Sequence, residues 1–418
     1  MTPDAALEQV VRVEWGRLVA LLLGRFRRLD LVEDALADAV ETAARRWPRD
    51  GTPDDPAAWL HTAARRRVLD RLRAEAMALR KAPLLVVEAE RGPGGGAMAD
   101  PGGIVEDDVL RLVLMCCHPA LAPEVASALA LRLVVGVTTA DIARLFLVPE
   151  ATMAARLTRG KKKIVAAGIP YAVPAAADLP DRMRTVAQTA YLAFTAGYAP
   201  GSGTDLLRAD LAGEAVRLVR TTLALRPEEP VLRALLALVL LQHSRRDARV
   251  GPDGRLVLLP DQDRDRWHHD EVVEALGLLA DVPVGTDPLT ESYRLQAVVG
   301  ALHATAPSAS ETRWDRVCEA YDALAVVNPS PSVRLARAVA VAERDGTTAG
   351  LAALEGLDEA LPTSHRVPAV RGELLARLGD RPGAVAALAV AIDRCGNAVE
   401  RAHLTARRDG LLDPPSAR

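Results

Sequence analysis

Aromatic residues and cysteines are both scarce in this chain. Phe, Trp and Tyr together make up 3% of its 418 residues, whereas 50% of the residues are hydrophobic, mainly alanine and leucine. This composition favours packed helices with few strands, because alanine and leucine are strong helix formers. The cysteines are Cys116, Cys117, Cys318 and Cys395. They form no disulfide framework, and we expect reduced thiols.

Long apolar runs and a strong net charge are also absent. No apolar stretch reaches the length of a membrane span, and residues 1–10 lack a basic region followed by an apolar one. We therefore expect a soluble cytoplasmic protein with no membrane partner. The formal net charge of −3 argues against a uniformly basic nucleic-acid binder, so any contact with DNA must come from local patches. A chain of 418 residues is long enough for two or three domains.

Residues 138–163 have the pattern of a helix-turn-helix. A short amphipathic helix is predicted from Thr139, a turn over 146–149, and a second helix from Glu150. Apolar side chains share one face of the second helix, and hydroxyl and cationic side chains form a stripe on the opposite face. That stripe comprises Thr152, Arg156, Arg159 and Lys163. It suits the phosphate-lined groove of DNA, although a solvated basic helix end is the alternative interpretation.

Two further helical segments precede this motif. Residues 29–47 predict a helix with an acidic polar side that includes Glu33, Asp34 and Asp38. After a turn-rich loop at 48–56, residues 57–75 predict a second helix. Its five closely spaced arginines are Arg65, Arg66, Arg67, Arg71 and Arg73. Such a density of cations indicates an anionic partner or a fully solvated face.

A stretch rich in glycine and proline separates the two helical modules. Residues 88–103 are too rich in these residue types to form a helix, and we assign 83–105 as a flexible linker. A glycine-rich phosphate cradle is disfavoured, because no strand precedes the segment and no Lys-Ser pair follows it. Cys116, Cys117 and His118 are also a poor metal site. Adjacent cysteines on a helix point about 100° apart, so a buried thiol pair is the better interpretation.

The order of these segments resembles an extracytoplasmic-function (ECF) sigma factor of bacterial RNA polymerase. Residues 1–82 resemble its region 2, which binds core polymerase and the −10 element. Residues 106–170 resemble its region 4, a helix-turn-helix that reads the −35 element. The resemblance implies a factor that binds core RNA polymerase, recognises promoter DNA as duplex and as melted strand, and has no enzymatic activity, cofactor or metal.

The resemblance also assigns residues to three contacts. Core polymerase would be bound by Leu31, Asp34, Leu36 and Asp38. The −10 element would be bound by Arg49, Asp50 and Gly51 of the loop and by Arg65, Arg66, Arg67, Arg71 and Arg73 of the arginine-rich helix. The −35 element would be bound by Glu150, Thr152, Met153, Ala155, Arg156, Arg159 and Lys163.

Residues 171–418 form a long C-terminal extension with an internal repeat. Residues 337–354 align with 371–388 at a period of 34, the period of tetratricopeptide (TPR) repeats, so we predict TPR-like helix pairs near 331–410. One short hairpin strand is expected at 255–259. The extension resembles that of an ECF subgroup in which a fused helical domain is thought to replace a separate anti-sigma protein as the regulator. We expect it to act by packing on the sigma modules or by binding another protein or a ligand.

The sequence thus predicts an all-α protein with two small sigma modules followed by a helical, TPR-like domain. The predicted function is promoter recognition and promoter melting for RNA polymerase. The alternative is a helix-turn-helix repressor or activator with a repeat sensor domain, which would leave the acidic and arginine-rich helices without a use. An enzyme is disfavoured because no nucleophile, base and orienting group cluster recognisably.

Overall fold

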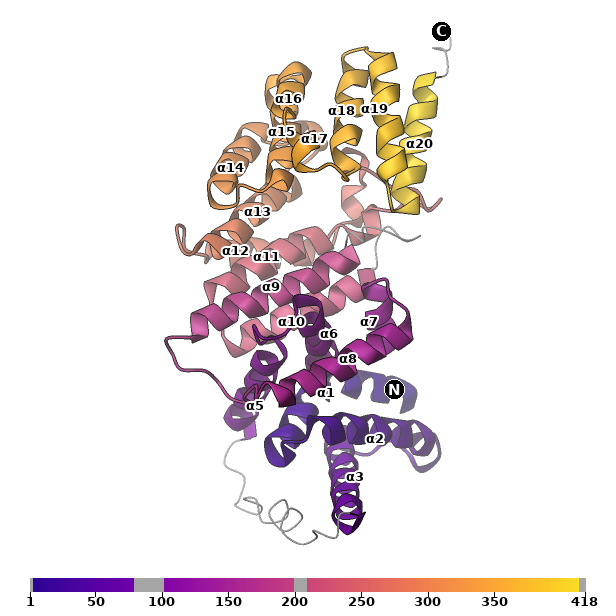
Figure 1. Cartoon of the computed structure of the whole chain (residues 1–418), viewed down its shortest axis with the longest axis vertical. Helices are drawn as coiled ribbons and strands as arrows, with labels where there is room; N and C mark the ends of the chain where they lie inside the picture. The colour runs from indigo at the N-terminus through magenta and orange to yellow at the C-terminus, as the bar shows by residue number, and fades with distance from the viewer. Residues whose placement is uncertain (1–2, 79–100, 199–208, 413–418) are drawn as a thin grey trace. The chain divides into compact units, whose positions relative to one another are not determined.

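The computed structural model describes residues 3–78, 101–198 and 209–412, and these ranges are helical (Figure 1). The all-α fold class is therefore confirmed. Within the described ranges the expected strand at 255–259 does not form. A tight turn closes there through hydrogen bonds from Gly251 N to Arg255 O (2.9 Å) and from Val257 N to Arg249 O (2.9 Å). Pairing is limited to one bridge between Val250 and Leu256, because the chain enters a 3₁₀ turn at Leu259.

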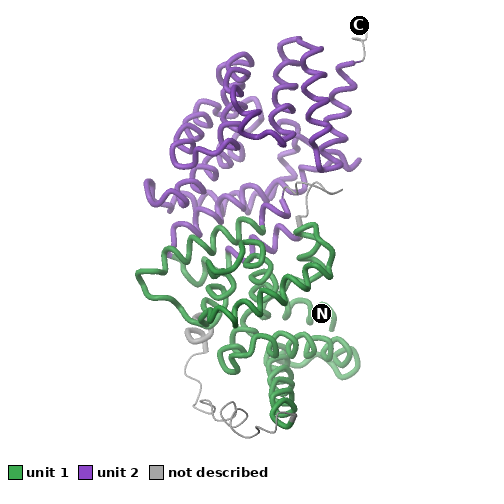
Figure 2. Tube along the Cα trace, viewed as in Figure 1, with its two compact units in different colours: residues 1–193, 220–227 green, residues 194–219, 228–418 purple. Residues whose placement is uncertain are grey.

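The chain divides into two compact units (Figure 2). Unit 1 contains residues 1–193 and 220–227, and unit 2 contains residues 194–219 and 228–418. Helices α9 (Leu179–Tyr198) and α10 (Ala209–Leu225) contribute residues to both units. Unit 1 therefore extends beyond residue 170.

The first part of unit 1 is a bundle of three mutually packed helices. They are α1 (Pro3–Phe26), α2 (Leu29–Asp50) and α3 (Pro56–Ala78). The start of α3 follows from its sequence: the Asp55 carboxylate accepts a hydrogen bond from Ala58 N at 2.9 Å, and Pro56 occupies the first helical position. The fully buried Leu22, Leu36 and Leu60 contribute one side chain from each helix to the core.

The second part of unit 1 contains the helix-turn-helix. It comprises α5 (Pro101–Cys116), α6 (Pro123–Ala130), a π-helical turn η1 (Leu131–Val135), α7 (Thr139–Leu145) and α8 (Glu150–Ala166). Helix α5 begins inside the predicted linker, because Pro101 fits the first turn of a helix, where its missing N–H has no partner to lose. Residues 83–100 of that linker lie outside the described residues.

Unit 2 consists mainly of helices that pack on their neighbours in the chain. Its longer helices after α10 are α11 (Pro230–His243), α12 (His269–Ala280), α13 (Pro288–Thr305), α14 (Trp314–Val327), α15 (Pro331–Asp345), α16 (Thr347–Ala353), α18 (Arg366–Arg377), α19 (Arg381–Arg394) and α20 (Ala398–Leu412). A single turn, α17 (Leu357–Ala360), and four 3₁₀ turns connect them: η2 (Arg246–Ala248), η3 (Leu259–Asp261), η4 (Arg264–Arg266) and η5 (Ala309–Glu311). Successive helices from α13 to α16 and from α18 to α20 are in contact.

The two copies of the 34-residue repeat fold as the helix pairs α15–α16 and α18–α19. Each pair crosses at one glycine and one alanine. A Cβ added to Gly350 would lie 3.2 Å from the carbonyl oxygen of Ala338, and one added to Gly372 would lie 3.2 Å from that of Ala384. The positions are offset by 34, since 372 − 338 = 34 and 384 − 350 = 34. The equivalent crossings support an internal repeat, while its TPR character remains a prediction.

Candidate nucleic-acid interface

The helix-turn-helix is fixed by local capping and by a tight turn. The Thr138 hydroxyl accepts a hydrogen bond from Asp141 N (3.1 Å) and donates one to the Asp141 carboxylate (2.8 Å), which caps α7. In the turn, Leu147 has a positive φ of 55°, and Val148 N donates to Ala143 O at 3.1 Å. Met153 is fully buried. It anchors α8 instead of facing solvent.

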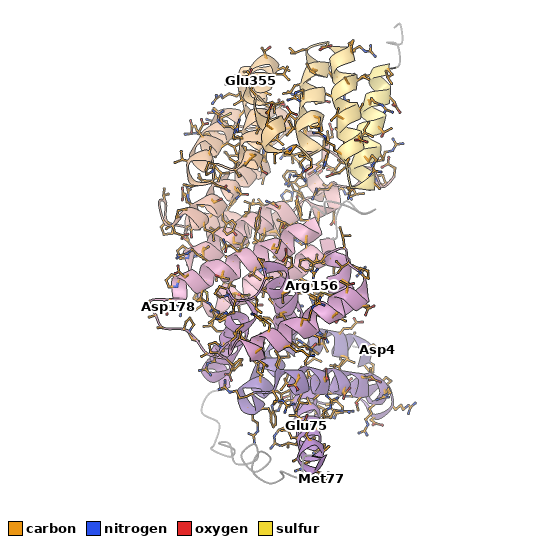
Figure 3. All side chains as sticks on the ribbon, viewed as in Figure 1. Asp4, Glu75, Met77, Arg156, Asp178 and Glu355 are labelled. Atoms are coloured by element: carbon orange, nitrogen blue, oxygen red, sulfur yellow. The ribbon has the colours of Figure 1, made fainter. Side chains whose placement is uncertain are left out.

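The opposite side of α8 is open and cationic. Thr152, Arg159 and Lys163 are exposed and Arg156 is half-buried; Figure 3 labels Arg156 on this helix. In the described part of the chain, none of the three cations forms a hydrogen bond or an ion pair through its side chain. Glu150 and Ala155 are also exposed on α8. This surface can therefore meet phosphates without first breaking internal ion pairs.

The acidic and arginine-rich helices of the first bundle are paired with each other. Arg67 lies 3.3 Å from Asp38, and Arg71 lies 3.0 Å from Asp38 and 3.3 Å from Asp34. Arg67 also donates to the Thr42 hydroxyl at 2.8 Å. The structure thus joins two residue sets to which the sequence assigned different partners.

The other arginines of α3 differ in their partners. Arg73 lies 3.3 Å from Asp70 on its own helix. The side chains of Arg65 and Arg66 form no hydrogen bond or ion pair within the described ranges. Arg65 lies near His61, whose pKa is lowered by burial and by the adjacent cations. Arg65 and Arg66 are therefore the cations of α3 most available to an external anion.

The predicted −10 loop residues lie at the end of α2. Arg49 and Asp50 are exposed in its last turn, and Gly51 has a positive φ of 88° and donates its N–H to Trp47 O at 3.0 Å. Trp47 also contacts Trp59 edge to face, with ring centroids 5.7 Å apart. The corner between α2 and α3 is thus held by two tryptophans beneath an exposed polar turn.

The predicted core-binding residues differ in exposure. The side chain of Asp34 is 62% exposed and that of Asp38 is 36% exposed. Leu31 and Leu36 are buried. In this arrangement only the two acids offer polar atoms to a partner.

A buried ion-pair network joins the first bundle to the helix-turn-helix. Glu33 is 7% exposed and accepts from Arg132 at 2.7 Å and from Lys161 of α8 at 2.8 Å. Burial raises the pKa of the Glu33 carboxyl, but Lys161 and Arg132 outweigh that effect and hold the pKa below its ordinary value. The sequence placed Glu33 on the acidic polar side of its helix, and the structure buries it against two cations of the same chain. The signal was present, because Glu33 lies four residues after the buried Leu29 and three before the buried Leu36.

Close backbone packing surrounds this junction. Trp15 of α1 donates its indole N–H to Arg132 O at 3.0 Å, and the Arg132 guanidinium lies 5.2 Å from its ring centroid. Gly136, with φ of 83°, allows the approach, since an added Cβ would lie 2.8 Å from the Trp15 ring. The Tyr171 hydroxyl lies 2.9 Å from two acceptors, Ala20 O and Asp108 O, and donates its proton to these carbonyls. We define Glu33, Arg132, Lys161, Trp15 and Gly136 as the junction.

The cysteines and other possible metal ligands give no metal centre in unit 1. The four cysteines are free and buried, and burial raises the pKa of the Cys117 thiol to about 12. This confirms the predicted buried thiols. In unit 2, His365, Cys395 and Glu400 have potential ligand atoms within 4.8 Å of one another. His365 already pairs with Glu400 at 3.0 Å, and the Cys395 thiol donates to Asn397 O at 3.4 Å, so these groups are satisfied without an ion.

Among the described residues, no helix is both long enough and apolar enough to cross a membrane.

Comparison with known proteins assigns both parts of unit 1. Residues 13–77 match Sigma-70 region 2, and residues 111–164 match Sigma-70 region 4. Residues 182–282 match a family of unknown function, DUF6596. An uncharacterized protein of Rhizobium meliloti (strain 1021) is 41% identical over 397 residues, which cover 94% of this chain and 93% of that protein. The similarity therefore includes both units.

The junction leads to a test of stability. Glu33→Gln removes the negative charge between Arg132 and Lys161, and we expect it to weaken the junction by about 3–5 kcal/mol. The control is Glu41→Gln on the same helix, whose surface pair with Arg45 (3.4 Å) is worth about 0–1 kcal/mol. Hydrogen exchange of the η1 and α8 amides measures the difference. Equal protection in the two variants would contradict a stabilising role for Glu33.

The same junction should respond to acid. Because the folded pKa of Glu33 lies below its ordinary value of 4.5, its contribution is complete above that value and is lost as the pH falls through the folded pKa. Glu33→Gln should lack this part of the acid sensitivity.

Proposed function

The chain belongs to the sigma-70 family, because it contains both Sigma-70 region 2 and Sigma-70 region 4, and as a sigma factor it directs RNA polymerase to promoters. We propose that it does so as an ECF sigma factor regulated by unit 2. As a sigma factor it has no catalytic step of its own. The cationic face of α8, free of internal ion pairs in the described residues, is the observation that carries the DNA-binding assignment. A simple helix-turn-helix regulator would not need the region 2 bundle.

At the −35 element, α8 enters the major groove. Arg156, Arg159 and Lys163 hold the duplex by charge, and arginine can also read guanine edges. Glu150, Thr152 and Ala155 lie near the exposed start of the helix and complete the base-facing surface. Met153 contributes by anchoring α8 to the rest of region 4.

At the −10 element, the exposed turn and the free arginines of region 2 act together. Arg49, Asp50 and Gly51 form the turn that contacts an unstacked base, while Arg65 and Arg66 hold the melted strand by charge. Arg67, Arg71 and Arg73 already have acidic partners. They contribute to strand binding in proportion to how readily those pairs open.

Core polymerase binds α2 through Asp34 and Asp38. Both acids remain partly exposed while paired with Arg71, so they can exchange an internal cation for one on the polymerase. Leu31 and Leu36 support this helix from its buried side.

The junction implies two states of unit 1. The −35 and −10 elements are separate sites on one duplex, and each intervening base pair adds about 3.4 Å to the distance between them. With Lys161 2.8 Å from Glu33, α8 cannot contact one element while region 2 contacts the other. The junction therefore holds a closed state that opens on the promoter. The opening loses the Glu33 ion pairs, and contacts with DNA and polymerase compensate for them.

A charge-reversal experiment tests the −35 assignment. The double variant Arg156→Glu and Arg159→Glu should reduce promoter-specific transcription by about tenfold or more, and lower the slope of log affinity against log salt by about 2. Reversal of Arg266 and Arg316 in unit 2 gives the same change in net charge and should leave both quantities unchanged. Run-off transcription with purified core polymerase and salt titration of promoter binding provide the measurements. Unchanged transcription by the α8 variant would remove the assignment.

A distance measurement tests the closed and open states. Because the native cysteines are buried, fluorophores can be attached to cysteines introduced at the exposed Arg46 of α2 and Lys162 of α8. This pair should show efficient energy transfer in the free protein. Transfer should be lost when core polymerase and promoter DNA are added. Retention of transfer in a complex that still transcribes would refute the opening.

A truncation tests regulation by unit 2. Ending the chain after Pro227 keeps all residues of unit 1, including Thr189, whose carbonyl accepts a hydrogen bond from Ser127 at 2.8 Å. We expect promoter output per molecule of bound polymerase to differ from that of the full chain. Equal output, with the truncated protein shown to be folded by circular dichroism, would leave unit 2 without a regulatory role.

A further inference from the structure

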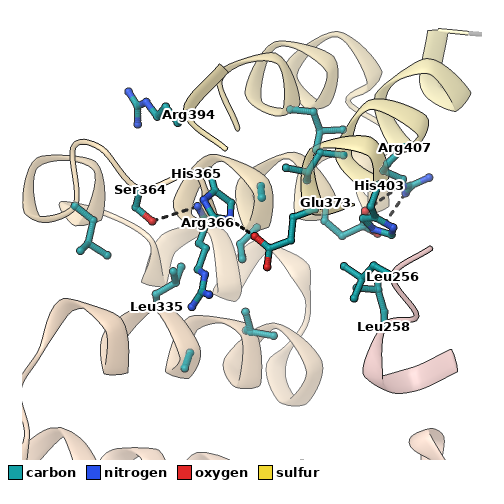
Figure 4. Close-up of a pocket in the computed structure, with 18 of the residues that line it drawn as sticks. Leu256, Leu258, Leu335, Ser364, His365, Arg366, Glu373, Arg394, His403 and Arg407 are labelled. Carbon is teal, nitrogen blue, oxygen red and sulfur yellow. Dashed lines mark hydrogen bonds and ion pairs between the residues drawn. The ribbon is translucent and has the colours of Figure 1, made fainter. Parts of the chain in front are cut away.

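Unit 2 contains a cavity that no part of the sigma mechanism uses. Its volume is about 890 Å³, within the range typical of small-molecule sites. The walls come from the loop at 256–258, from α15, from α18 and the loop before it, and from α19 and α20 (Figure 4). The 256–258 loop, α15 and the consecutive helices α18 to α20 therefore line one space.

Most charged side chains around the cavity are already paired. Arg407 lies 2.9 Å from Glu373, and Arg377 lies 2.5 Å from Glu343 outside the cavity. Glu400 pairs with His365 at 3.0 Å. The acids of the wall are therefore occupied by internal cations.

Two arginines of the lining, Arg366 and Arg394, are different from these residues, because in the described ranges neither guanidinium donates a hydrogen bond or forms an ion pair. Arg366 is exposed on the cavity wall at the first position of α18. Its backbone N–H is satisfied by Ser364 at 3.2 Å. Its charge reaches Glu400 and Cys395 through space, and it helps to keep the pKa of Glu400 low after the larger effect of the His365 hydrogen bond. The planar donors of Arg366 remain available for a carboxylate or phosphate.

The imidazole of His403 is a second polar group on the wall without a hydrogen-bond partner in the described structure. It is half-buried on α20. In Figure 4 it lies opposite Leu256 and Leu258. It adds a polar contact to a wall that is otherwise partly apolar.

The remaining lining is apolar and only partly covered. Leu258 is 45% exposed, although it borders the cavity. Leu256, Val370 and Leu404 are half-buried, and Leu335 and Leu388 are buried at the base. A ligand with an apolar body would remove the exposed leucine surface from water.

We propose that this cavity binds a small anionic amphiphile, with its acidic group on Arg366 and its apolar body against Leu256, Leu258 and Leu404. The combination of a free guanidinium and an uncovered apolar wall favours such a ligand over a neutral apolar molecule or a polar anion. A metal ion is disfavoured because Arg366 adds positive charge beside His365, Cys395 and Glu400. We expect this ligand to be the signal that acts through unit 2, and this part of the inference rests on the regulatory role proposed for unit 2.

Decanoate and decanol are suitable probes because they share a chain length and differ in charge. Isothermal titration calorimetry with the full chain, below the concentration at which decanoate forms micelles, should show saturable binding of decanoate at least about tenfold tighter than that of decanol. Absence of saturable decanoate binding, or equal affinity for the two probes, overturns the proposal.

Variants locate the site. Arg366→Gln should reduce decanoate affinity to that of decanol, and Arg366→Lys should retain part of the preference, since it keeps the charge but loses the two-pronged geometry. The matched control is Arg266→Gln, which removes another exposed arginine of unit 2 that has no side-chain partner in the described ranges and does not line the cavity. Wild-type decanoate affinity in Arg366→Gln overturns the site. Binding and promoter output are separate measurements, so a failure here differs from a failure of regulation by unit 2.

Discussion

The buried carboxylate of Glu33 is the interaction on which the arrangement of unit 1 depends. A buried acid is costly unless cations compensate it, and both cations come from region 4: Arg132 at 2.7 Å and Lys161 at 2.8 Å. Neither module satisfies this network alone. If the modules separated, water would solvate the Glu33 carboxylate. The junction can therefore open more readily than an apolar core, whose side chains are not stabilised by water. Such a contact suits the proposed function, in which the two modules are held together in the free protein and separate on the promoter.

Region 2 uses the same principle with weaker contacts. Asp34 and Asp38 on α2 pair with Arg67 and Arg71 on α3, and these side chains are between 36% and 62% exposed. Surface ion pairs of this kind contribute little to stability and exchange readily. The contacts proposed for these residues, of the acids with polymerase and of the arginines with a nucleic-acid strand, would therefore not require the bundle to unfold. Internal pairing in the free protein also limits non-specific attraction of these arginines to nucleic acid.

The sequence predicted local features well and long-range packing poorly. Periodicity was sufficient for the helices and for the free cationic stripe of α8, because helix faces follow from spacing over a few residues. The burial of Glu33 was missed, since it depends on Arg132 and Lys161, which are 99 and 128 residues away. The role of Gly136 could be predicted only in part. Its positive φ is a local feature, but its close contact with Trp15 depends on residues far away in the sequence. The strand expected at 255–259 does not form for another reason. The glycine- and proline-rich sequence before it correctly predicts a turn, but a turn does not by itself provide a partner strand.

The repeat in unit 2 shows how equivalent helix crossings can be built from different residues. At the first crossing the glycine is Gly350 on the second helix, and at the equivalent crossing it is Gly372 on the first helix. A glycine on either helix of the pair lets the two helices approach closely. The crossing is therefore the same in both copies of the repeat, although the glycine and the alanine exchange places. Contacts across the repeat are likewise made by ion pairs 34 residues apart, Glu343 with Arg377 and Glu373 with Arg407. These pairs occupy Glu373, Arg377 and Arg407 of the cavity lining, whereas the guanidinium groups of Arg366 and Arg394 have no side-chain partner in the described residues.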